Sequence, residues 1–82
     1  MWHVYILRSK IKRWYYVGST NRLQKRILEH NSGNTVSTKA YRPFDLIFNK
    51  TFKYEIDARK YERKLKDKRI EKEQIIKETE DK

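Results

Sequence analysis

Two tyrosines, Tyr5 and Tyr16, are the residues of this chain whose types and setting most clearly suggest chemistry. Tyr5 lies in the apolar segment His3–Leu7, and Tyr16 lies in Trp14–Thr20, which is rich in aromatic residues. A short basic stretch, residues 8–13, joins the two segments. Two paired strands with a turn of this length would bring both phenol groups close together. A phenol exchanges protons near pH 10, so it acts as a base at neutral pH only beside cations or a metal.

Arg26 and His30 follow on a segment with helical periodicity, and their spacing of four residues places them on one helix face. A guanidinium matches phosphate oxygens, and an imidazole exchanges protons near neutral pH. Hydrolysis of a phosphodiester needs an activated nucleophile and neutralised phosphoryl oxygens, so the set suggests that reaction. Simpler readings exist: strand tyrosines are common, Arg26 can pair with Glu29, and a histidine near a helix C-terminus favours the helix dipole.

Glu62 is the carboxylate we single out as a metal ligand. It borders the apolar face formed by Ala58, Tyr61 and Leu65. One carboxylate completed by water and phosphate oxygens is a normal magnesium site. The composition alone leaves Glu55 and Asp57 as competitors; most other acids of the C-terminal third stand at helical spacing from Lys or Arg and look like solvated ion pairs.

The formal net charge of +10 is concentrated in the first two thirds of the chain. Residues 1–54 hold eleven Lys or Arg and two acids, whereas residues 55–82 hold ten and nine. This field favours polyanions, with nucleic acid ahead of an anionic membrane, and we expect no membrane partner. The predicted nucleic-acid contacts are Arg8, Lys10, Arg13, Arg22, Lys25, Lys39 and Arg42.

With 82 residues the chain is expected to form one small domain, with a core over about residues 2–67 and a helical tail over 68–80. The absence of cysteine excludes disulfides and thiolate zinc sites. No apolar run reaches membrane-spanning length and no secretory leader is recognisable, so we expect a cytoplasmic protein.

Hydrophobic periodicity predicts three strands and three helical segments. The strands are expected at residues 2–7, 14–17 and 44–52, and the helices at about 21–32, 57–67 and, weakly, 68–82. Residues 8–13 are expected to form a turn and residues 34–43 a loop.

Local signals suggest where the helices begin and end. Asn21, with Gln24 three residues later, fits an N-terminal capping box, and Gly33 fits a left-handed C-terminal cap. Leu23 and Ile27 mark the buried face of the first helix. The last helix has only Ile70, Ile75 and Ile76 as apolar anchors, and its final five residues are expected to fray.

The chain resembles the GIY-YIG nuclease superfamily, and more closely its small stand-alone bacterial single-domain branch. The resemblance runs from about Trp2 to Ile76, and the order and spacing of its pieces are more specific than any one piece. The matching pieces are HVYIL, YYVGSTNRLQKRILEHNSG, TKAYRPFDLIF, ARKYERKLK and EKEQIIK. The resemblance implies an α+β fold, a small three-stranded antiparallel sheet flanked by helices, and cleavage of nucleic acid that depends on Mg²⁺ or Mn²⁺.

The resemblance also implies roles for individual residues. Tyr5 and Tyr16 stand in the two tripeptides of the family's motif, where Tyr5 would deprotonate the attacking water and Tyr16 would assist it or bind phosphate. Arg26 matches the arginine that stabilises phosphate charge, and Glu62 matches the metal-binding glutamate. His30 is an accessory candidate. Which tyrosine is the base stays open.

The chain departs from the family's motif at three positions. His3 stands in place of the first glycine, which adds bulk beside the site, and Val4 and Val17 replace isoleucines, which preserves the strands. Asn31 matches a recurrent polar end to the first helix. Because the small branch often lacks that glycine, we do not interpret His3 as inactivation.

DNA is expected ahead of RNA as the substrate, and structure-selective cutting of branched, nicked or single-stranded DNA is a hypothesis. Its motive is the basic field together with exposed aromatic residues such as Trp14 and Tyr41, which could stack on unpaired bases. A protein partner that supplies specificity is a further option, and the oligomeric state is left open. The alternative functions are a nucleic-acid-binding module on the same fold with little turnover, and an assembly protein that uses its basic face on RNA or ribosomes.

Overall fold

The computed structural model describes residues 1–67 and 69–80. It contains a three-stranded antiparallel sheet and three helices, which confirms the expected α+β fold. The strands are β1 (Trp2–Ser9), β2 (Tyr15–Thr20) and β3 (Phe44–Phe52). The helices are α1 (Leu23–Ser32), α2 (Glu55–Asp67) and α3 (Arg69–Glu80), with a 3₁₀ turn, η1, at Lys39–Tyr41.

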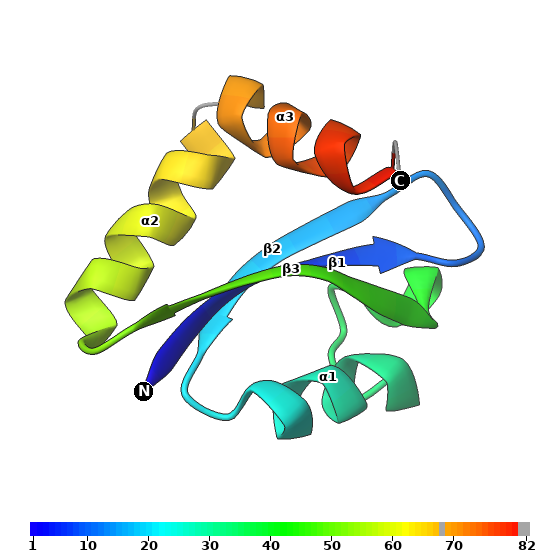
Figure 1. The fold of residues 1–82 in the computed structure, drawn as a ribbon. Helices are drawn as coiled ribbons and strands as arrows, with labels where there is room; N and C mark the ends of the chain where they lie inside the picture. Colours follow the sequence, from blue (N-terminus) through cyan, green and yellow to red (C-terminus); the bar gives the residue numbers. More distant parts are fainter. Residues whose placement is uncertain (68, 81–82) are drawn as a thin grey trace.

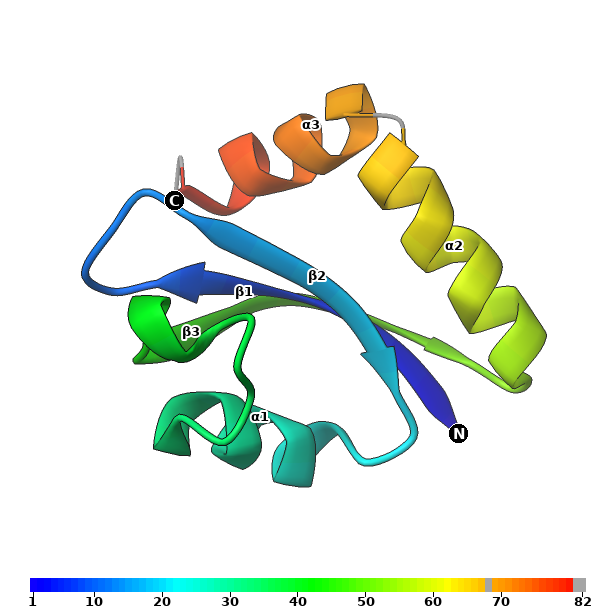
Figure 2. The ribbon, with the colours of Figure 1, turned by 180° about the vertical axis from the view of Figure 1, so that it is seen from behind.

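The sheet lies between two helical layers. Its strand order is β2-β1-β3, so β1 is central and pairs antiparallel with both neighbours. Helix α1 covers one face, and α2 and α3 cover the other (Figures 1 and 2). A strand enclosed in this way can be apolar on both faces, and Val4–Leu7 are fully buried, as expected for this segment.

Alternation along β1 divides the core into two clusters. Tyr5 and Leu7 point toward α1 and pack with Phe44 at the start of β3. Val4 and Ile6 point the other way. They pack with buried residues of β2 and α2, namely Val17, Ala58 and Leu65.

The boundaries of α1 confirm one capping prediction and correct another. Gly33 has a φ of 84° and ends the helix in the left-handed conformation, where its N–H donates to the carbonyl of His30. The predicted capping box is wrong, because the N-cap residue is Arg22 and no side chain caps the helix. Instead, the Arg22 N–H donates to Oγ1 of Thr20, so the turn that leaves β2 is made by threonine rather than by Asn21.

Other elements differ from expectation mainly in length. Strand β2 begins one residue later than predicted and continues three residues further, because Gly18, Ser19 and Thr20 keep pairing with β1. The loop over residues 34–43 contains the turn η1. Helix α2 begins at Glu55, two residues earlier than predicted, and buries the expected face of Ala58 and Leu65.

The C-terminal tail forms α3, which packs on the second face of the sheet through Ile75. The helix continues to Glu80, so the expected fraying is not seen at residues 78–80, and residues 81–82 lie outside the described part. The side chain of Ile70 also lies outside it. Among the described helices, none combines the length and the apolar character needed to cross a bilayer.

Candidate active site

The two tyrosines and His30 form one aromatic cluster on the α1 side of the sheet. Tyr5 and Tyr16 lie on neighbouring strands and point to the same face, and their ring centroids are 6.2 Å apart. The His30 ring lies 5.9 Å from the Tyr5 ring and 4.9 Å from the Tyr16 ring. Tyr5 is 1% exposed, whereas Tyr16 is half-buried at the edge strand. The structure thus brings together the three groups that the sequence singled out for proton transfer.

Gly18 provides the space that the Tyr5 hydroxyl occupies. It pairs directly with Tyr5 across the β1–β2 ladder. A Cβ atom at Gly18 would lie 2.6 Å from the Tyr5 hydroxyl oxygen and 2.9 Å from the ring of Tyr16, closer than any ordinary contact. The glycine is therefore required by close approach to the phenol, as strand glycines often are.

His30 is completely buried and bonded at both ring nitrogens. Its Nε2 lies 3.0 Å from the Tyr5 hydroxyl, and its Nδ1 lies 2.9 Å from Oγ1 of Thr38, which is also completely buried. This contradicts the simpler reading of His30 as a helix-end residue that only favours the dipole. Sequence reasoning missed Thr38, although it is the first residue of one of the pieces that resemble the family.

Burial sets the charge state of both hydrogen-bonded groups. It raises the pKa of Tyr5 to about 12, an effect to which the nearby Tyr16 adds and which the Arg26 guanidinium opposes. Burial, followed by repulsion from Arg26, lowers the pKa of His30 to about 4. At neutral pH the phenol keeps its proton and the imidazole is uncharged, so His30 has a nitrogen lone pair that can accept a proton.

Arg26 lies between the tyrosines and an acidic partner on its own helix. Its guanidinium donates to the Glu29 carboxylate at 3.1 Å and lies near enough to Tyr5 to oppose the rise in the pKa of that phenol. That contact with Glu29 is the main cause that raises the pKa of Arg26 and lowers the pKa of Glu29. The pairing with Glu29 anticipated as the simpler reading therefore exists, and it holds the cation at the edge of the cluster.

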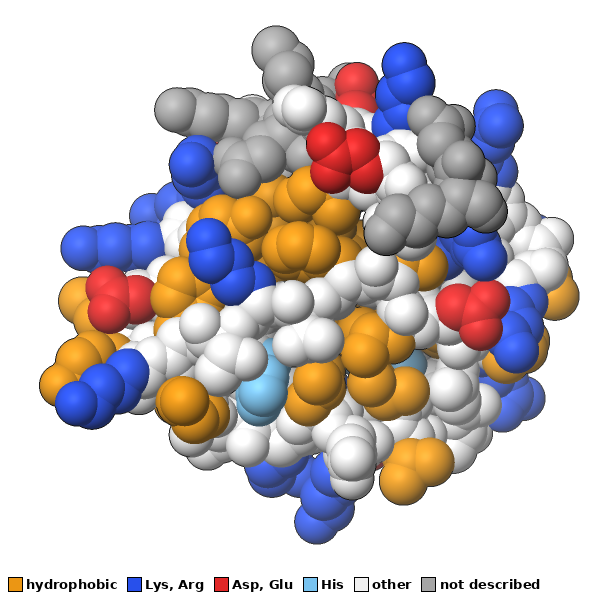
Figure 3. Space-filling model, viewed as in Figure 1, with side chains coloured by type: hydrophobic (Ala, Val, Ile, Leu, Met, Phe, Trp, Pro, Cys, Tyr) orange, Lys and Arg blue, Asp and Glu red, His pale blue; other side chains and the backbone are white. Residues whose placement is uncertain are grey.

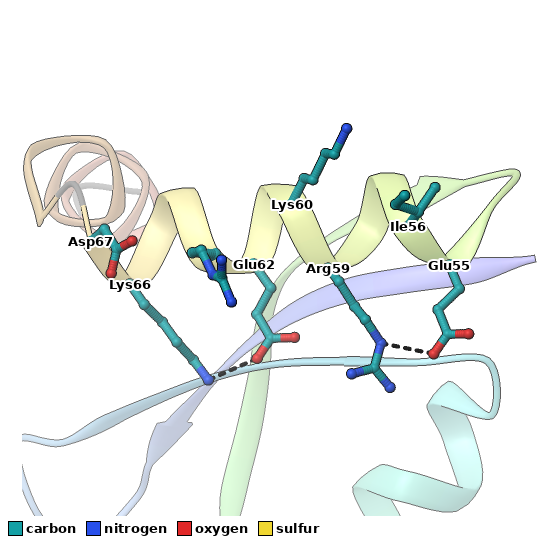
Figure 4. A pocket seen from close by; sticks show the side chains of 8 residues that line it. Glu55, Ile56, Arg59, Lys60, Glu62, Lys66 and Asp67 are labelled. Atoms are coloured by element: carbon teal, nitrogen blue, oxygen red, sulfur yellow. Dashed lines mark hydrogen bonds and ion pairs between the residues drawn. The ribbon is translucent and has the colours of Figure 1, made fainter.

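Glu62 approaches β2 from the opposite face of the sheet. One carboxylate oxygen accepts a hydrogen bond from the Ser19 hydroxyl, and the other is 2.7 Å from the ammonium of Lys66 on the next turn of α2 (Figure 4). The Glu62 side chain is 20% exposed. Its charge still reaches the phenol on the other face, since it adds to the rise in the pKa of Tyr5.

The competing carboxylates are less suited to hold a metal. Glu55 and Asp57 are both exposed, and Glu55 pairs with Arg59 at 2.7 Å. Glu62 contributes to an open hollow whose lining comes entirely from α2 (Figure 4). Across residues 1–67 and 69–80 no three acidic or histidine side chains converge on one point, so Glu62 fits only a metal that takes its remaining ligands from water and substrate.

The residues predicted to contact nucleic acid are spread over the end of β1, the loops, α1 and η1, and several have partners within the fold. Arg8 and Lys10 lie 3.5 Å and 3.4 Å from the Asp45 carboxylate, and Arg22 lies 3.8 Å from Glu29. Arg42 donates to the Ser32 carbonyl and so caps α1. The remaining members, all exposed, are Arg13, Lys25 and Lys39. In Figure 3 the basic side chains stand around the outline of the face rather than in one block.

Trp14 and Tyr41 are not the exposed stacking platforms that the sequence suggested. Both are half-buried, and their rings stack on each other with centroids 4.0 Å apart and planes 10° apart. The Lys12 ammonium lies over the Tyr41 ring, 5.5 Å from its centre. One face of each ring is therefore covered by the other ring, which removes the motive for structure-selective binding through these two residues.

Asn31 braces the cluster from the end of α1. Its side-chain oxygen accepts a 2.7 Å hydrogen bond from the N–H of Phe44, the first residue of β3. This bond ties the helix that carries Arg26 and His30 to the sheet that carries the tyrosines. The residue matched to a recurrent polar helix end therefore has a structural task here.

Comparison with known proteins accords with this geometry. The chain is 41% identical over 71 residues to a UPF0213 protein of Bacillus pumilus (strain SAFR-032). The aligned region covers 77% of this chain and 72% of the relative. It is 40% identical over 55 residues to the UPF0213 protein YazA of Bacillus subtilis (strain 168), which covers 66% of this chain. That match spans about half the relative's length, 54%.

The fold has a solved counterpart in the solution NMR structure of a UPF0213 protein from Bacillus halodurans. The TM-score is 0.57 at 32% identity, covering 94% of this chain and 84% of the other. The names of these relatives state no activity, so the chemistry has to be argued from the site. The sequence also matches the GIY-YIG catalytic domain over residues 1–80. The chain therefore belongs to the GIY-YIG domain family and has small UPF0213 proteins among its relatives.

Proposed function

We propose that this protein hydrolyses phosphodiester bonds in nucleic acid with the help of a divalent metal ion, Mg²⁺ or Mn²⁺. The observation that carries the proposal is the convergence of two phenols, an imidazole and a guanidinium on one side of the β1–β2 pair, with Glu62 reaching the same pair from the other side. DNA is proposed ahead of RNA from the family resemblance alone.

The proton path of the proposed reaction begins at Tyr5. The attacking water gives a proton to the Tyr5 oxygen while the phenol proton moves to Nε2 of His30, 3.0 Å away. The hydroxide forms a bond to phosphorus, and the bond from phosphorus to the leaving oxygen breaks. The leaving oxygen then takes a proton from solvent. Tyr16 is the more accessible phenol, and we assign it to the phosphate rather than to the water.

The negative charge of the phosphoryl group would be neutralised by Arg26 and by the metal that Glu62 holds. The Arg26 guanidinium turns from Glu29 to the phosphoryl oxygens, where a fork of N–H donors is most effective as charge develops. Glu62 would hold the metal, which when bound supplies positive charge to the phosphoryl and leaving oxygens. The Ser19 hydroxyl orients the Glu62 carboxylate by donating to one of its oxygens. The metal would compete with the Lys66 ammonium for the other carboxylate oxygen.

Cleavage of a mixed panel of nucleic acids tests the proposal. The panel holds duplex, single-stranded, flap and four-way DNA together with RNA, each with Mg²⁺, Mn²⁺ or EDTA. Wild type is compared with Arg26→Ala, Glu62→Gln, Tyr5→Phe and Tyr16→Phe. We expect the wild type to cut in a metal-dependent manner. The value of kcat should fall by at least about a hundredfold in each of three variants, Glu62→Gln, Arg26→Ala and Tyr5→Phe. This is a typical cost of losing an acid–base or charge-stabilising group. Tyr16→Phe should raise KM more than it lowers kcat.

A binding module with little turnover is the second candidate. The observation that favours it is that both charged groups of the site are already paired, Arg26 with Glu29 and Glu62 with Lys66. In that case the protein would bind nucleic acid in a salt-sensitive manner, without cutting any member of the panel. Binding would also survive Glu62→Gln, because the carboxylate repels rather than attracts phosphate. Metal-dependent cutting by wild type removes this candidate.

A further inference from the structure

Thr38 lies behind His30, on the side of the imidazole away from Tyr5. It precedes the turn η1 in the loop between α1 and β3, and its side chain is completely buried. Its hydroxyl touches Nδ1 of His30 at 2.9 Å and the carbonyl oxygen of Thr35 at 3.4 Å. A carbonyl oxygen can only accept a hydrogen bond, so the hydroxyl can give its hydrogen to Thr35 and receive one from His30.

The other end of the contact chain indicates the same direction. The Arg26 guanidinium near Tyr5 is a cation that carries only hydrogens, so the Tyr5 hydrogen is favoured to point away from it. The Tyr5 hydrogen then needs an acceptor, and Nε2 of His30 lies 3.0 Å away. No buried side-chain nitrogen or oxygen among the described residues lacks a hydrogen-bond partner, and the chain of bonds from Tyr5 to Thr35 is satisfied when every donor points the same way.

We propose that Thr38 is a positioning residue that holds the neutral His30 as its Nδ1–H tautomer, so that the bare Nε2 faces the Tyr5 hydroxyl. The opposite tautomer would place a hydrogen on Nε2, leave the Tyr5 hydrogen without an acceptor, and close the outlet for its proton. The tautomer itself is a property of the resting protein. Its consequence for catalysis rests on the proposed function.

The test is the ¹⁵N spectrum of the histidine side chains at neutral pH, in which protonated and bare ring nitrogens resonate in separate ranges. The chain has only two histidines, so a His3→Gln variant assigns His30 directly. We expect a protonated Nδ1 and a bare Nε2 at His30 in the wild type and in Thr38→Ser. Thr38→Val, which loses the acceptor, should shift the tautomer ratio toward Nε2–H by about fivefold, the effect of one ordinary hydrogen bond.

Thr51→Val is the matched control, because Thr51 is the threonine that contacts the other histidine, His3, at 3.4 Å. It should leave the His30 signals unchanged. A protonated Nε2 at His30 in the wild type overturns the proposal, even if Thr38→Val fails to fold. An unchanged tautomer ratio in a folded Thr38→Val protein also overturns it.

Activity measurements separate this proposal from the proposed function. If the protein cleaves nucleic acid, Thr38→Val should lower kcat with little change in KM, and Thr38→Ser should restore it. If the wild type has the Nδ1–H tautomer but cuts no substrate, the proposed function fails and the assignment to Thr38 stands. If it cuts substrate with a protonated Nε2, only the assignment fails.

Discussion

At the scale of single residues, the site depends on groups that are buried rather than displayed. Tyr5 and His30 are almost inaccessible, and a methyl group added at Gly18 would collide with the Tyr5 hydroxyl. The properties of the site therefore follow from packing and desolvation at a few positions. Two predictions belong to this scale.

The first concerns the two glycines of the chain, which are needed for different reasons. In Gly18→Ala the new methyl group would meet the Tyr5 hydroxyl at 2.6 Å and displace it from His30. We expect a loss of about 1–3 kcal/mol in the free energy of unfolding, typical of overpacking, together with loss of cleavage.

Gly33→Ala is the matched control, because that glycine is required by its φ of 84°. It should cost about 1–2 kcal/mol through backbone strain and spare cleavage by the folded fraction. Denaturant unfolding and cleavage assays on both variants check the pair. Full cleavage by a folded Gly18→Ala protein would contradict the role given to that contact.

The second concerns pH. The pKa of His30 is about 4 in the folded protein against an ordinary value of 6.5, so the unfolded chain binds the proton more readily. The stability from keeping His30 neutral is therefore complete above pH 6.5 and is lost as pH falls toward 4, by on the order of 3 kcal/mol. Unfolding free energies of wild type and His30→Gln across this range measure it. The same slope in both proteins would show that other groups cause it.

At the scale of elements, the site is assembled from helices on opposite faces of the sheet. Helix α1 brings Arg26 and His30 to one side of β2, and α2 brings Glu62 to the other. The edge strand β2 borders both helices' groups, since the ring of Tyr16 lies 4.9 Å from that of His30 on one face and the Ser19 hydroxyl donates to Glu62 on the other. The position of α2 against this edge thus determines whether a metal at Glu62 can act near the phenols.

The prediction at this scale concerns Lys66, whose ammonium holds one oxygen of Glu62. A metal ion that binds this oxygen competes with the lysine, because the ammonium uses one of its lone pairs and repels a second cation beside it. Lys66→Met should therefore bind Mn²⁺ about two- to fivefold more tightly, in line with the modest strength of partly exposed ion pairs. Titration with Mn²⁺ followed by paramagnetic broadening measures this without substrate. Lys60→Met, on the same helix and pointing away from the sheet in Figure 4, should bind like wild type. Weaker binding by Lys66→Met would refute the competition.

At the scale of the whole molecule, a net charge of +10 on 82 residues creates a field that attracts polyanions. The basic side chains come from strands, loops and helices alike, and several are paired with Asp45 or Glu29. Long-range attraction is consequently a property of the total charge, whereas phosphate contacts at the site depend on exposed members near α1 and the β1–β2 loop.

The corresponding prediction is a strong salt dependence of nucleic-acid binding. On the prediction that Arg13 and Lys25 each contact one phosphate, Arg13→Gln and Lys25→Gln should each reduce the slope of log K against log salt by about one. Lys77→Gln, on α3 at the other face of the sheet, should leave the slope unchanged. Equal effects of all three substitutions on the slope would mean that only net charge matters. Fluorescence anisotropy across a salt series provides the measurement.

Much of the fold follows from local patterns in the sequence. The unbroken apolar run of β1 predicted a central strand, the spacing of Ala58, Tyr61 and Leu65 predicted the buried face of α2, and Gly33 predicted the end of α1. The failures are also local: the capping box is wrong because Thr20 satisfies the helix entry, and β2 is longer because pairing with β1 outweighs the weak strand preference of glycine.

The sequence by itself determined the candidates Tyr5, Tyr16, Arg26 and His30, because residue type and spacing are local properties. It preferred Glu62 to Glu55 and Asp57 through the resemblance to the family's motif. Only the tertiary structure decided what surrounds them. Thr38 behind His30, Lys66 against Glu62, and the mutual stacking of Trp14 and Tyr41 all depend on packing between segments, on burial and on exact side-chain distances. The same is true of the proton states of Tyr5 and His30, since desolvation exists only once the chain has folded around them.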